Sequence, residues 1–331
     1  MTPTLKNQKI LVTGGAGFIG SNLIDYLLNQ QNQVTCLDDL STGDINNLKT
    51  HKENPNFIFI KGDICDSNTC LSACKDMDII FHQAALGSVP RSIKHPQRTN
   101  DVNIGGFVNM ITAAKDQKVK RFVYAASSST YGDNETLPKR EDYIGKPLSP
   151  YAITKYVNEL YADIFHALYG INTIGLRYFN VFGKRQTPDG AYAAVIPKFI
   201  SLLLNYESPV IHGDGTQSRD FTYIQNVIQA NVRAATTENP NALNQVYNVA
   251  CGDNISLNDL TQELINQLAV FDEKIGKIKS TNGENRVGDI KHSLASIDKA
   301  KTLLGYQPEY NVHEGLQEAI GWYYKNLKQD D

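Results

Sequence analysis

A glycine-rich turn between an apolar segment and an amphipathic segment limits the possible folds of this chain more than any other feature. Lys9–Thr13 is typical of a buried parallel strand, and apolar residues at helical spacing run from Ile19 to about residue 30. The glycines between them fit G-x-G-x-x-G and an overlapping, longer spacing: Gly14, Gly15, Gly17 and Gly20. Glycine lets the backbone approach a pyrophosphate and lets a helix lie close to a strand. The order of strand, turn and helix therefore predicts a dinucleotide-binding unit.

An acidic pair follows the next apolar run. Gln33–Leu37 has the character of a second strand, and it ends at Asp38 and Asp39, roughly 20 residues beyond the glycines. An acid at this place is suited to hydrogen-bond the ribose hydroxyls of a dinucleotide, and its charge would repel a 2′-phosphate. The sequence therefore favours NAD over NADP.

Apolar runs alternate with amphipathic segments through the first half of the chain, which predicts an α/β fold with a Rossmann-type, doubly wound parallel sheet. Further strands are expected at 56–60, 77–82, 120–126 and 173–176, and long helices at 100–115 and 150–168. After Gly183 the alternation of apolar strands and amphipathic helices becomes less regular. Residues 184–193 and 209–219 are polar and are predicted to be loops, and helices are expected at 257–268 and 313–326. We expect an NAD-binding domain at 1–183, with return of a segment near 222–250, and a smaller α/β substrate domain at 184–331.

Composition excludes several classes of protein. The net charge of the 331 residues is −3 without a basic stripe, which argues against nucleic acid as a partner. No run of 18 apolar residues occurs and the N-terminus is polar, so we expect no membrane span or signal peptide and a cytoplasmic location. The five cysteines form no C-x-x-C pair and are expected to be buried free thiols. Histidine spacing gives no support to a metal site.

Tyr151 and Lys155 are the strongest candidates for catalysis. They are four residues apart in a predicted helix and therefore share one face. A lysine ammonium close to the phenol should lower its pKa and make it a general base. A Y-x-x-x-K pair alone is more often an ordinary surface pair, so the prediction depends on the glycine fingerprint upstream.

Six ordered motifs over nearly the whole chain resemble the extended short-chain dehydrogenase/reductase family. They are T-G-G-A-G-F-I-G (13–20), D-D-L-S-T-G (38–43), H-Q-A-A (82–85), S-S-S-T-Y-G (127–132), Y-x-x-x-K (151–155) and R-Y-F-N-V-F-G (177–183). Members acting on nucleotide sugars include 4-epimerases, 4,6-dehydratases, decarboxylases and reductases. The resemblance implies a tightly bound, recycled NAD held by Gly14, Gly17, Phe18, Ile19, Gly20, Asp38, Asp39, Ser41, Thr42, Gly43, Asp63, Ile64, Gln83, Ala84, Ala85, Tyr151, Lys155 and Tyr178.

The serine cluster separates the possible reactions. Ser127 matches the family's catalytic hydroxyl, beside Tyr151 and Lys155. Related dehydratases carry Thr-Asp-Glu where this chain has Ser127, Ser128 and Ser129. Elimination then lacks its acid and base, and 4-epimerisation through a transient 4-keto sugar is favoured.

The resemblance also implies a UDP-sugar substrate. Arg286 and Asp289 match an R-x-G-D motif that grips the diphosphate and the uridine ribose, Arg219 matches a second diphosphate contact, and 191–197 matches a uracil pocket. Both arginines could instead be surface ion-pair residues. The implied substrate contacts are Gly87, Ser88, Ser127, Ser128, Ser129, Tyr151, Asn180, Ala194, Val195, Gly213, Arg219, Arg286, Asp289 and Ser293.

Ser293 suggests which sugar is preferred. Hexose-specific members carry a tyrosine at the matching position, so serine leaves room for a 2-acetamido group, and the loop Gly87–Ser92 resembles that of the subgroup acting on N-acetylated sugars. UDP-GlcNAc and UDP-GalNAc are therefore the expected substrates. Ser293 could also be a neutral surface substitution. UDP-glucose or UDP-uronate 4-epimerisation (with Arg91 facing the carboxylate) and nucleotide-sugar reduction remain alternatives, and a non-catalytic NAD sensor is disfavoured because Ser127, Tyr151 and Lys155 are all kept.

The two long helices carry more apolar residues than one sheet face requires. These residues are Phe107, Val108, Ile111, Val157, Leu160, Tyr161 and Ile164. Family members pair these helices about a two-fold axis, so we expect a homodimer through a four-helix bundle.

Overall fold

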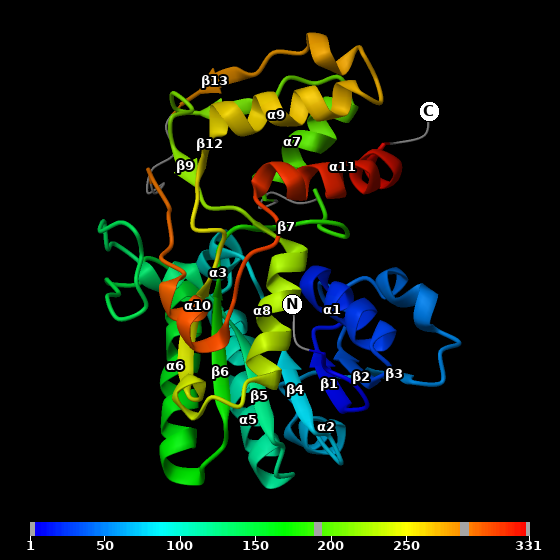
Figure 1. The fold of residues 1–331 in the computed structure, drawn as a ribbon, viewed down its shortest axis with the longest axis vertical. Helices are drawn as coiled ribbons and strands as arrows, with labels where there is room; N and C mark the ends of the chain where they lie inside the picture. Colours follow the sequence, from blue (N-terminus) through cyan, green and yellow to red (C-terminus); the bar gives the residue numbers. More distant parts are fainter. Residues whose placement is uncertain (1–3, 189–193, 285–290, 329–331) are drawn as a thin grey trace.

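A seven-stranded parallel sheet forms the centre of the molecule (Figure 1). The structure, a computed structural model, describes residues 4–188, 194–284 and 291–328. The strand order is β11-β6-β5-β4-β1-β2-β3, and every neighbouring pair is parallel. The bounds are β1 Lys9–Thr13, β2 Gln33–Asp38, β3 Phe57–Lys61, β4 Ile79–His82, β5 Arg121–Ser127, β6 Thr173–Tyr178 and β11 Gln245–Val249. The predicted doubly wound, Rossmann-type fold is confirmed.

Strand side chains alternate between two apolar layers, because successive residues of a strand point to opposite faces. On β1, Ile10 and Val12 belong to one core and Leu11 to the other. The first core also contains buried residues of α1 (Phe18–Asn29) and α8 (Ile224–Thr236). The second contains those of α2 (Ser67–Ala73), α5 (Gly106–Asp116) and α6 (Pro150–Tyr169). Helices therefore cover both faces, and the apolar strand runs are explained by burial on two sides.

Short strands and helices lie at the end of the molecule beyond the carboxyl ends of the sheet strands (Figure 1). The strand pairs are β7 (Val181–Phe182) with β10 (Thr222–Tyr223), β8 (Val210–His212) with β13 (Thr281–Gly283), and β9 (Ser218–Arg219) with β12 (Ile255–Ser256). The helices of this region are α3 (Val89–Lys94), α7 (Val195–Leu204), α9 (Leu257–Ala269) and α11 (Val312–Leu327). Helix α4 (Pro96–Asn100) packs against α6, and α10 (Asp298–Leu304) packs against β11. The division of the chain at residue 183 into two domains stays a prediction.

Two expectations about secondary structure are wrong. The predicted loop at 209–219 contains β8 and β9, which pair with β13 and β12, segments far along the chain that local composition cannot reveal. The helix expected at 100–115 is interrupted: a π-helical turn, Asp101–Gly105, precedes α5. That turn carries the buried Asn103, whose side-chain oxygen accepts a hydrogen bond from the backbone N–H of Leu86. Such π-helical turns are frequent near functional sites.

The cysteines only partly follow the prediction. All five are free thiols, and Cys36, Cys70 and Cys74 are buried, but Cys65 and Cys251 are half-buried. Within the described parts of the chain, no helix combines the length and hydropathy needed to cross a membrane.

Candidate active site

A cleft of about 1160 Å³ opens at the carboxyl ends of β1, β2 and β4. All the expected cofactor contacts line this cleft except Tyr151, Lys155 and Tyr178. Three of the expected substrate contacts, Gly87, Ser88 and Ala194, line it as well. Residues from several separate segments of the sequence therefore meet in one cavity, at the place where parallel α/β sheets usually bind ligands.

The glycine turn forms one wall of this cleft. Gly14 has φ +67°, and a Cβ there would lie 2.7 Å from the backbone of Ala84. A Cβ on Gly20 would overlap the carbonyl oxygen of Gly14, and one on Gly17 would lie 3.2 Å from it. Gly15 does not line the cleft; its Cβ would lie 2.5 Å from Cys36 Sγ. The overlapping spacing Gly14, Gly17, Gly20 is thus the one that faces the cleft.

Helix α1 presents its N-terminus to the same cavity. Gly17 is its N-cap without a side-chain hydrogen bond, and the first turn contains no acidic residue. Unpaired N–H groups and the helix dipole together favour an anion at this position. The glycine turn and the helix end fit the diphosphate of a dinucleotide.

The two acids after β2 differ in their surroundings. Asp38 is buried, and its two oxygens accept the backbone N–H groups of Ala16 and Leu40, each at 2.9 Å. Burial raises the pKa of Asp38 more than these hydrogen bonds lower it. Asp39 is more exposed, and its Oδ1 accepts from both the N–H and the hydroxyl of Ser41. Asp38 therefore fixes the turn, while Asp39 stands at the rim.

Tyr151 and Ser127 meet where β5 ends and α6 begins. Ser127 is the last residue of β5, and Ser129 Oγ donates a 2.9 Å hydrogen bond to Ser127 Oγ. The N-cap Ser149 accepts from the N–H of Ala152 and so sets the first turn of α6, which carries Tyr151. Burial raises the pKa of Tyr151, and a hydrogen bond with the Ser127 side chain opposes part of that rise.

Lys155 lies on the same helix but does not perturb Tyr151 as predicted. Its Nζ donates a 2.7 Å hydrogen bond to the carbonyl oxygen of Ala125. Burial lowers the pKa of Lys155 to about 8, and the charge of Glu159 opposes part of the fall. The predicted lowering of the Tyr151 pKa is wrong for this structure, because desolvation outweighs the other influences on the phenol.

Two buried polar side chains that sequence reasoning missed hold this region together. Ser92 Oγ accepts the backbone N–H of Tyr151 at 3.0 Å and donates to Val89 O at 2.6 Å. Asn103 accepts the N–H of Leu86 at 2.8 Å and donates to Thr154 Oγ1 at 3.1 Å. The loop after β4 is thus fixed to the first turns of α6. Neither residue had a recognisable signal in the sequence.

The remaining predicted contacts lie outside the cleft lining. The Tyr178 hydroxyl is within hydrogen-bond distance of Gln83 and Asn231. Asn180 donates to the carbonyl oxygen of Asp220, and the N–H of Ser293 bonds the carbonyl oxygen of Ser218. The others in the described ranges are Val195 at the start of α7, Gly213 after β8, Arg219 on β9, and Ser128 and Ser129 in the turn after β5. Arg286, Asp289 and residues 191–193 of the expected uracil pocket lie outside the described residues.

A buried carboxylate connects the segments around Arg219 and Ser293. Asp220 accepts backbone N–H groups from Cys251 at 2.9 Å, Gly252 at 3.1 Å and Ala295 at 3.2 Å. Burial raises its pKa to about 7 in spite of these bonds. The motif around Arg219 therefore includes a structural acid, which sequence reasoning had not distinguished from its neighbours.

A second connection joins the Ser293 segment to the catalytic elements. The long connection from Gly132 to Ser149, between Ser127 and Tyr151 in sequence, contains Lys139, whose N–H donates to Leu294 O at 2.8 Å. The N–H of Ser296 in turn donates to Lys139 O at 2.9 Å. The segment 294–296 is therefore fixed to the chain that joins β5 to α6.

Other residues of the cleft gave no recognisable signal in the sequence. Arg185 lines the cleft, and its guanidinium lies 3.0 Å from the carboxylate of Asp25 of α1. Lys184 forms a second ion pair with the same carboxylate. Trp322 of α11 lies at the opposite end of the chain. In the described ranges, no group of three His, Cys, Asp or Glu side chains is arranged to hold a metal ion.

Comparison with known proteins gives the family. The model of the "NAD dependent epimerase/dehydratase family" matches residues 10–250. A solved structure of a UDP-N-acetylglucosamine 4-epimerase from Methanobrevibacter ruminantium, in complex with UDP-N-acetylmuramic acid, is 40% identical with a TM-score of 0.90, and the match covers 97% of this chain and 99% of that one. A UDP-glucose 4-epimerase from Thermotoga maritima, solved with UDP-glucose, is 34% identical with a TM-score of 0.87, covering 96% and 99%.

A third structure contains the cofactor. The UDP-glucuronic acid 4-epimerase from Bacillus cereus, solved with UDP-glucuronic acid and NAD, is 33% identical with a TM-score of 0.83, covering 97% of this chain and 99% of that one. NAD is therefore the cofactor, as predicted, and the glycine turn and the end of α1 fit it. The chain belongs to the NAD-dependent epimerase/dehydratase family and is an isomerase of the UDP-sugar 4-epimerase type.

Proposed function

We propose that this enzyme interconverts UDP-GlcNAc and UDP-GalNAc in preference to the non-acetylated UDP-hexoses, through a transient 4-keto sugar. The observation that carries the proposal is that the Tyr151 phenol lies near enough to the Ser127 side chain for the latter to affect its pKa, next to two further serines and with no Asp or Glu among residues 127–129. This arrangement can move a proton to and from a sugar hydroxyl. It provides no carboxylate for the elimination of water.

Each catalytic residue has a distinct task. Tyr151 takes the proton of the sugar 4-hydroxyl and later returns it, and Ser127 orients the phenol. Lys155, held by Ala125, supplies positive charge within the buried part of the site. Bound NAD supplies the acceptor and donor of the C4 hydride. Arg219, Arg286, Asp289 and Asn180 hold the UDP moiety while the sugar turns to present its other face.

The preference for acetylated sugars is assigned to two serines. Ser293 has a small side chain, and its backbone N–H donates to the carbonyl oxygen of Ser218. We assign the volume that a larger side chain would occupy at this position to the 2-acetamido group. Ser88 lines the cleft at the N-cap of α3, where its hydroxyl accepts the N–H of Arg91. Its hydroxyl proton is a candidate donor for the amide oxygen of the substrate. The 40% identity to a UDP-N-acetylglucosamine 4-epimerase supports this assignment.

UDP-glucuronate 4-epimerisation is the second candidate, because Arg91 lines the cleft and could face a 6-carboxylate. A relative that acts on UDP-glucuronic acid is 33% identical over 97% of this chain. The serine at 293 favours the acetylated sugars over this alternative.

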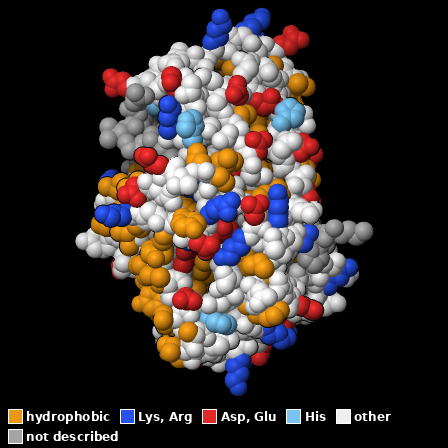
Figure 2. All heavy atoms as spheres, turned by 60° about the vertical axis from the view of Figure 1, so that its left-hand side comes forward, with side chains coloured by type: hydrophobic (Ala, Val, Ile, Leu, Met, Phe, Trp, Pro, Cys, Tyr) orange, Lys and Arg blue, Asp and Glu red, His pale blue; other side chains and the backbone are white. Residues whose placement is uncertain are grey.

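We further propose that the enzyme works in the cytoplasm as a homodimer. The exposed apolar residues of α6 run along one side of the helix and include Ile153, Leu160, Ile164 and Leu168, at 49%, 49%, 52% and 66% exposed. Helix α6 lies on the left-hand side of Figure 1, the side that comes forward in Figure 2. Figure 2 shows hydrophobic side chains gathered on the lower half of this face. Phe107 and Ile111 of α5 were expected to belong to this surface. They do not, because both are buried in the core of the monomer. The proposed bundle is therefore centred on α6.

A product assay tests the function. The purified enzyme is incubated separately with UDP-GlcNAc, UDP-glucose and UDP-glucuronic acid, and the products are resolved by chromatography. We expect C4 epimers, most rapidly from UDP-GlcNAc, without net consumption of NADH. Net oxidation of NADH would identify a reductase instead, and fastest turnover of UDP-glucuronic acid would identify the second candidate.

A further inference from the structure

The backbone of Tyr151 is hydrogen-bonded to the connection after β4 through both of its polar groups. Tyr151 is the second residue of α6, so its N–H has no carbonyl partner within the helix. Ser92 Oγ, on α3, accepts this N–H at 3.0 Å. The carbonyl oxygen of Tyr151 accepts the hydroxyl of Thr154 at 2.8 Å, and Thr154 Oγ1 in turn accepts the amide of Asn103 at 3.1 Å. Both groups thus lead to residues between β4 and α5.

The other donors in the first turn of α6 are satisfied by the residue that caps the helix. Ser149 accepts the N–H of Ala152 through its hydroxyl and that of Ile153 through its carbonyl oxygen, both at 3.1 Å. Pro150 has no N–H to donate. Within this fully described turn, the N–H of Tyr151 is therefore the one donor that depends on another part of the chain.

The hydroxyl of Ser92 can only accept toward Tyr151. Its single proton goes to the carbonyl oxygen of Val89 at 2.6 Å, which leaves the lone pairs for the N–H. The side chain of Ser92 is fully buried and does not line the cleft, so it has no surface through which to bind a ligand itself. Without this hydroxyl a buried N–H would lose its partner, and the first turn of α6 would no longer be held at this point.

The same connection carries residues that line the cleft. Leu86 and Ser88 are two of them, and Ser88 is the N-cap of α3, one turn before Ser92. The N–H of Ser92 donates to Ser88 O at 3.0 Å, and the amide oxygen of Asn103 accepts the N–H of Leu86 at 2.8 Å. Hydrogen bonds therefore join the backbone of Tyr151 to the wall of the cleft along two routes.

We propose that Ser92 is a positioning residue for the reaction, which holds the catalytic Tyr151 at a fixed place relative to the part of the cleft that receives the sugar. The inference rests on the proposed function, in which the phenol takes the proton of the sugar 4-hydroxyl. Proton transfer requires the two oxygens to approach within hydrogen-bond distance, and a misplacement of about 1 Å can cost about 10²-fold in rate. Loss of the Ser92 hydroxyl should therefore slow the chemical step and leave binding of the sugar nucleotide unchanged.

The test compares kcat and KM for the UDP-sugar that the enzyme converts fastest. Ser92→Ala should lower kcat about 10–100-fold with KM unchanged. Thr99→Val removes another fully buried hydroxyl of the same connection, but that hydroxyl donates to His95 O, at the start of its own helix α4, so kcat should not change. Tyr151→Phe with Ser92→Ala should be no slower than Tyr151→Phe alone, because Ser92 acts through the phenol.

Circular dichroism confirms the fold of each variant. Ser92→Cys, which keeps the size of the side chain and provides a weaker acceptor, replaces Ser92→Ala should the alanine variant not fold.

Each result decides between the possibilities. An unchanged kcat in Ser92→Ala, a rise in KM alone, a comparable loss in Thr99→Val, or a further loss in the Tyr151→Phe background would overturn the inference and leave the proposed function intact. Near wild-type turnover of Tyr151→Phe would overturn the proposed task of Tyr151, and the inference with it.

Discussion

The buried, charged Lys155 should lower the free energy of unfolding of the protein. Burial lowers its pKa from 10.5 to about 8. A shift of one pKa unit corresponds to about 1.4 kcal/mol, so holding the ammonium in the folded state costs about 3 kcal/mol. Lys155→Met removes this cost but leaves the Ala125 carbonyl without its donor, a loss of about 1 kcal/mol. We expect the variant to gain about 2 kcal/mol in free energy of unfolding at pH 7 and to lose activity.

The stability gained by Lys155→Met should decrease as the pH rises. Below pH 8 the lysine is charged in both states of the wild type, so the full cost is present. Between about pH 8 and 10.5 the unfolded state binds more protons, wild-type stability rises relative to the variant, and the difference shrinks.

Urea unfolding of dinucleotide-free protein at pH 7 and pH 10 measures this difference, with Lys301→Met, at an exposed lysine of α10, as the matched control. No stabilisation at pH 7, or a gain of equal size at pH 10 and in the control, would refute the reasoning.

Three other predictions concern the proposed site and assembly. Tyr151→Phe should reduce turnover by about 10²–10⁴-fold with UDP binding retained in calorimetry, since the lost group is an acid–base catalyst; near wild-type turnover would remove Tyr151 from the mechanism. Ser293→Tyr should abolish activity on UDP-GlcNAc and spare UDP-glucose in the product assay, because a ring would fill the acetamido space; equal losses would make Ser293 structural. Ile164→Glu should give a monomer by light scattering, whereas Val270→Glu, at an 83% exposed position after α9, should not.

The sheet could be predicted because its signals are local. The run Lys9–Thr13 has the bounds of β1, because its three central residues, Ile10, Leu11 and Val12, are apolar and buried on both faces of the sheet. The expected cofactor contacts after each strand came from the resemblance to the family, and parallel strands bring those that line the cleft to one edge of the sheet. The glycine spacing remained ambiguous until the backbone showed that Gly14, and not Gly15, faces the cleft.

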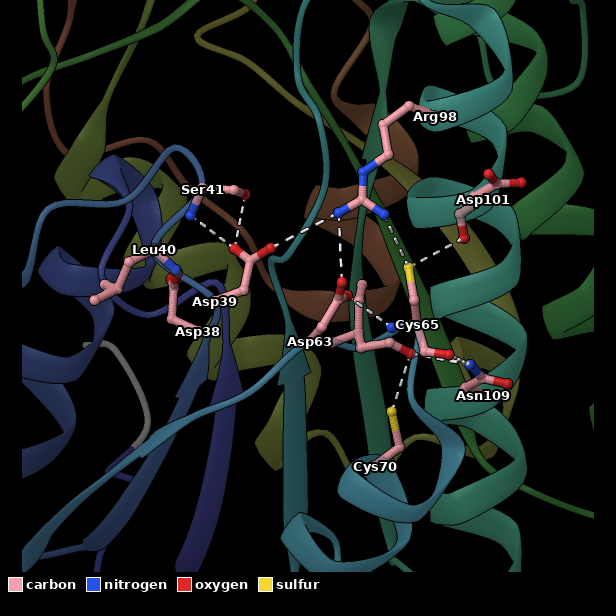
Figure 3. A network of polar contacts seen from close by, with 11 residues as sticks. Asp38, Asp39, Leu40, Ser41, Asp63, Cys65, Cys70, Arg98, Asp101 and Asn109 are labelled. Carbon is pink, nitrogen blue, oxygen red and sulfur yellow. Dashed lines mark hydrogen bonds and ion pairs between the residues drawn. The ribbon is translucent and has the colours of Figure 1, made fainter.

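The pKa of Tyr151 and the contacts of Arg98 could not be predicted, because both depend on the packing of distant segments. The i, i+4 rule places Lys155 on the correct helix face, but the direction of its side chain is set by the Ala125 carbonyl of β5. Arg98 stands in a short polar helix with no motif around it, and only the fold brings it to Asp39 and Asp63 (Figure 3). The pairing of β8 with β13 was hidden for the same reason.

The connection from Gly132 to Ser149 sets the spacing between the proposed catalytic residues and Ser293, the residue proposed to select the sugar. It leaves β5 just after Ser127, returns at Tyr151, and in between carries Lys139 bound to the segment that follows Ser293. An insertion or deletion in this connection would move Ser293 relative to the catalytic pair without replacing any residue that touches the sugar. On the proposed role of Ser293, sugar preference can therefore change with loop length, while the dinucleotide site and the sheet that builds it stay as they are.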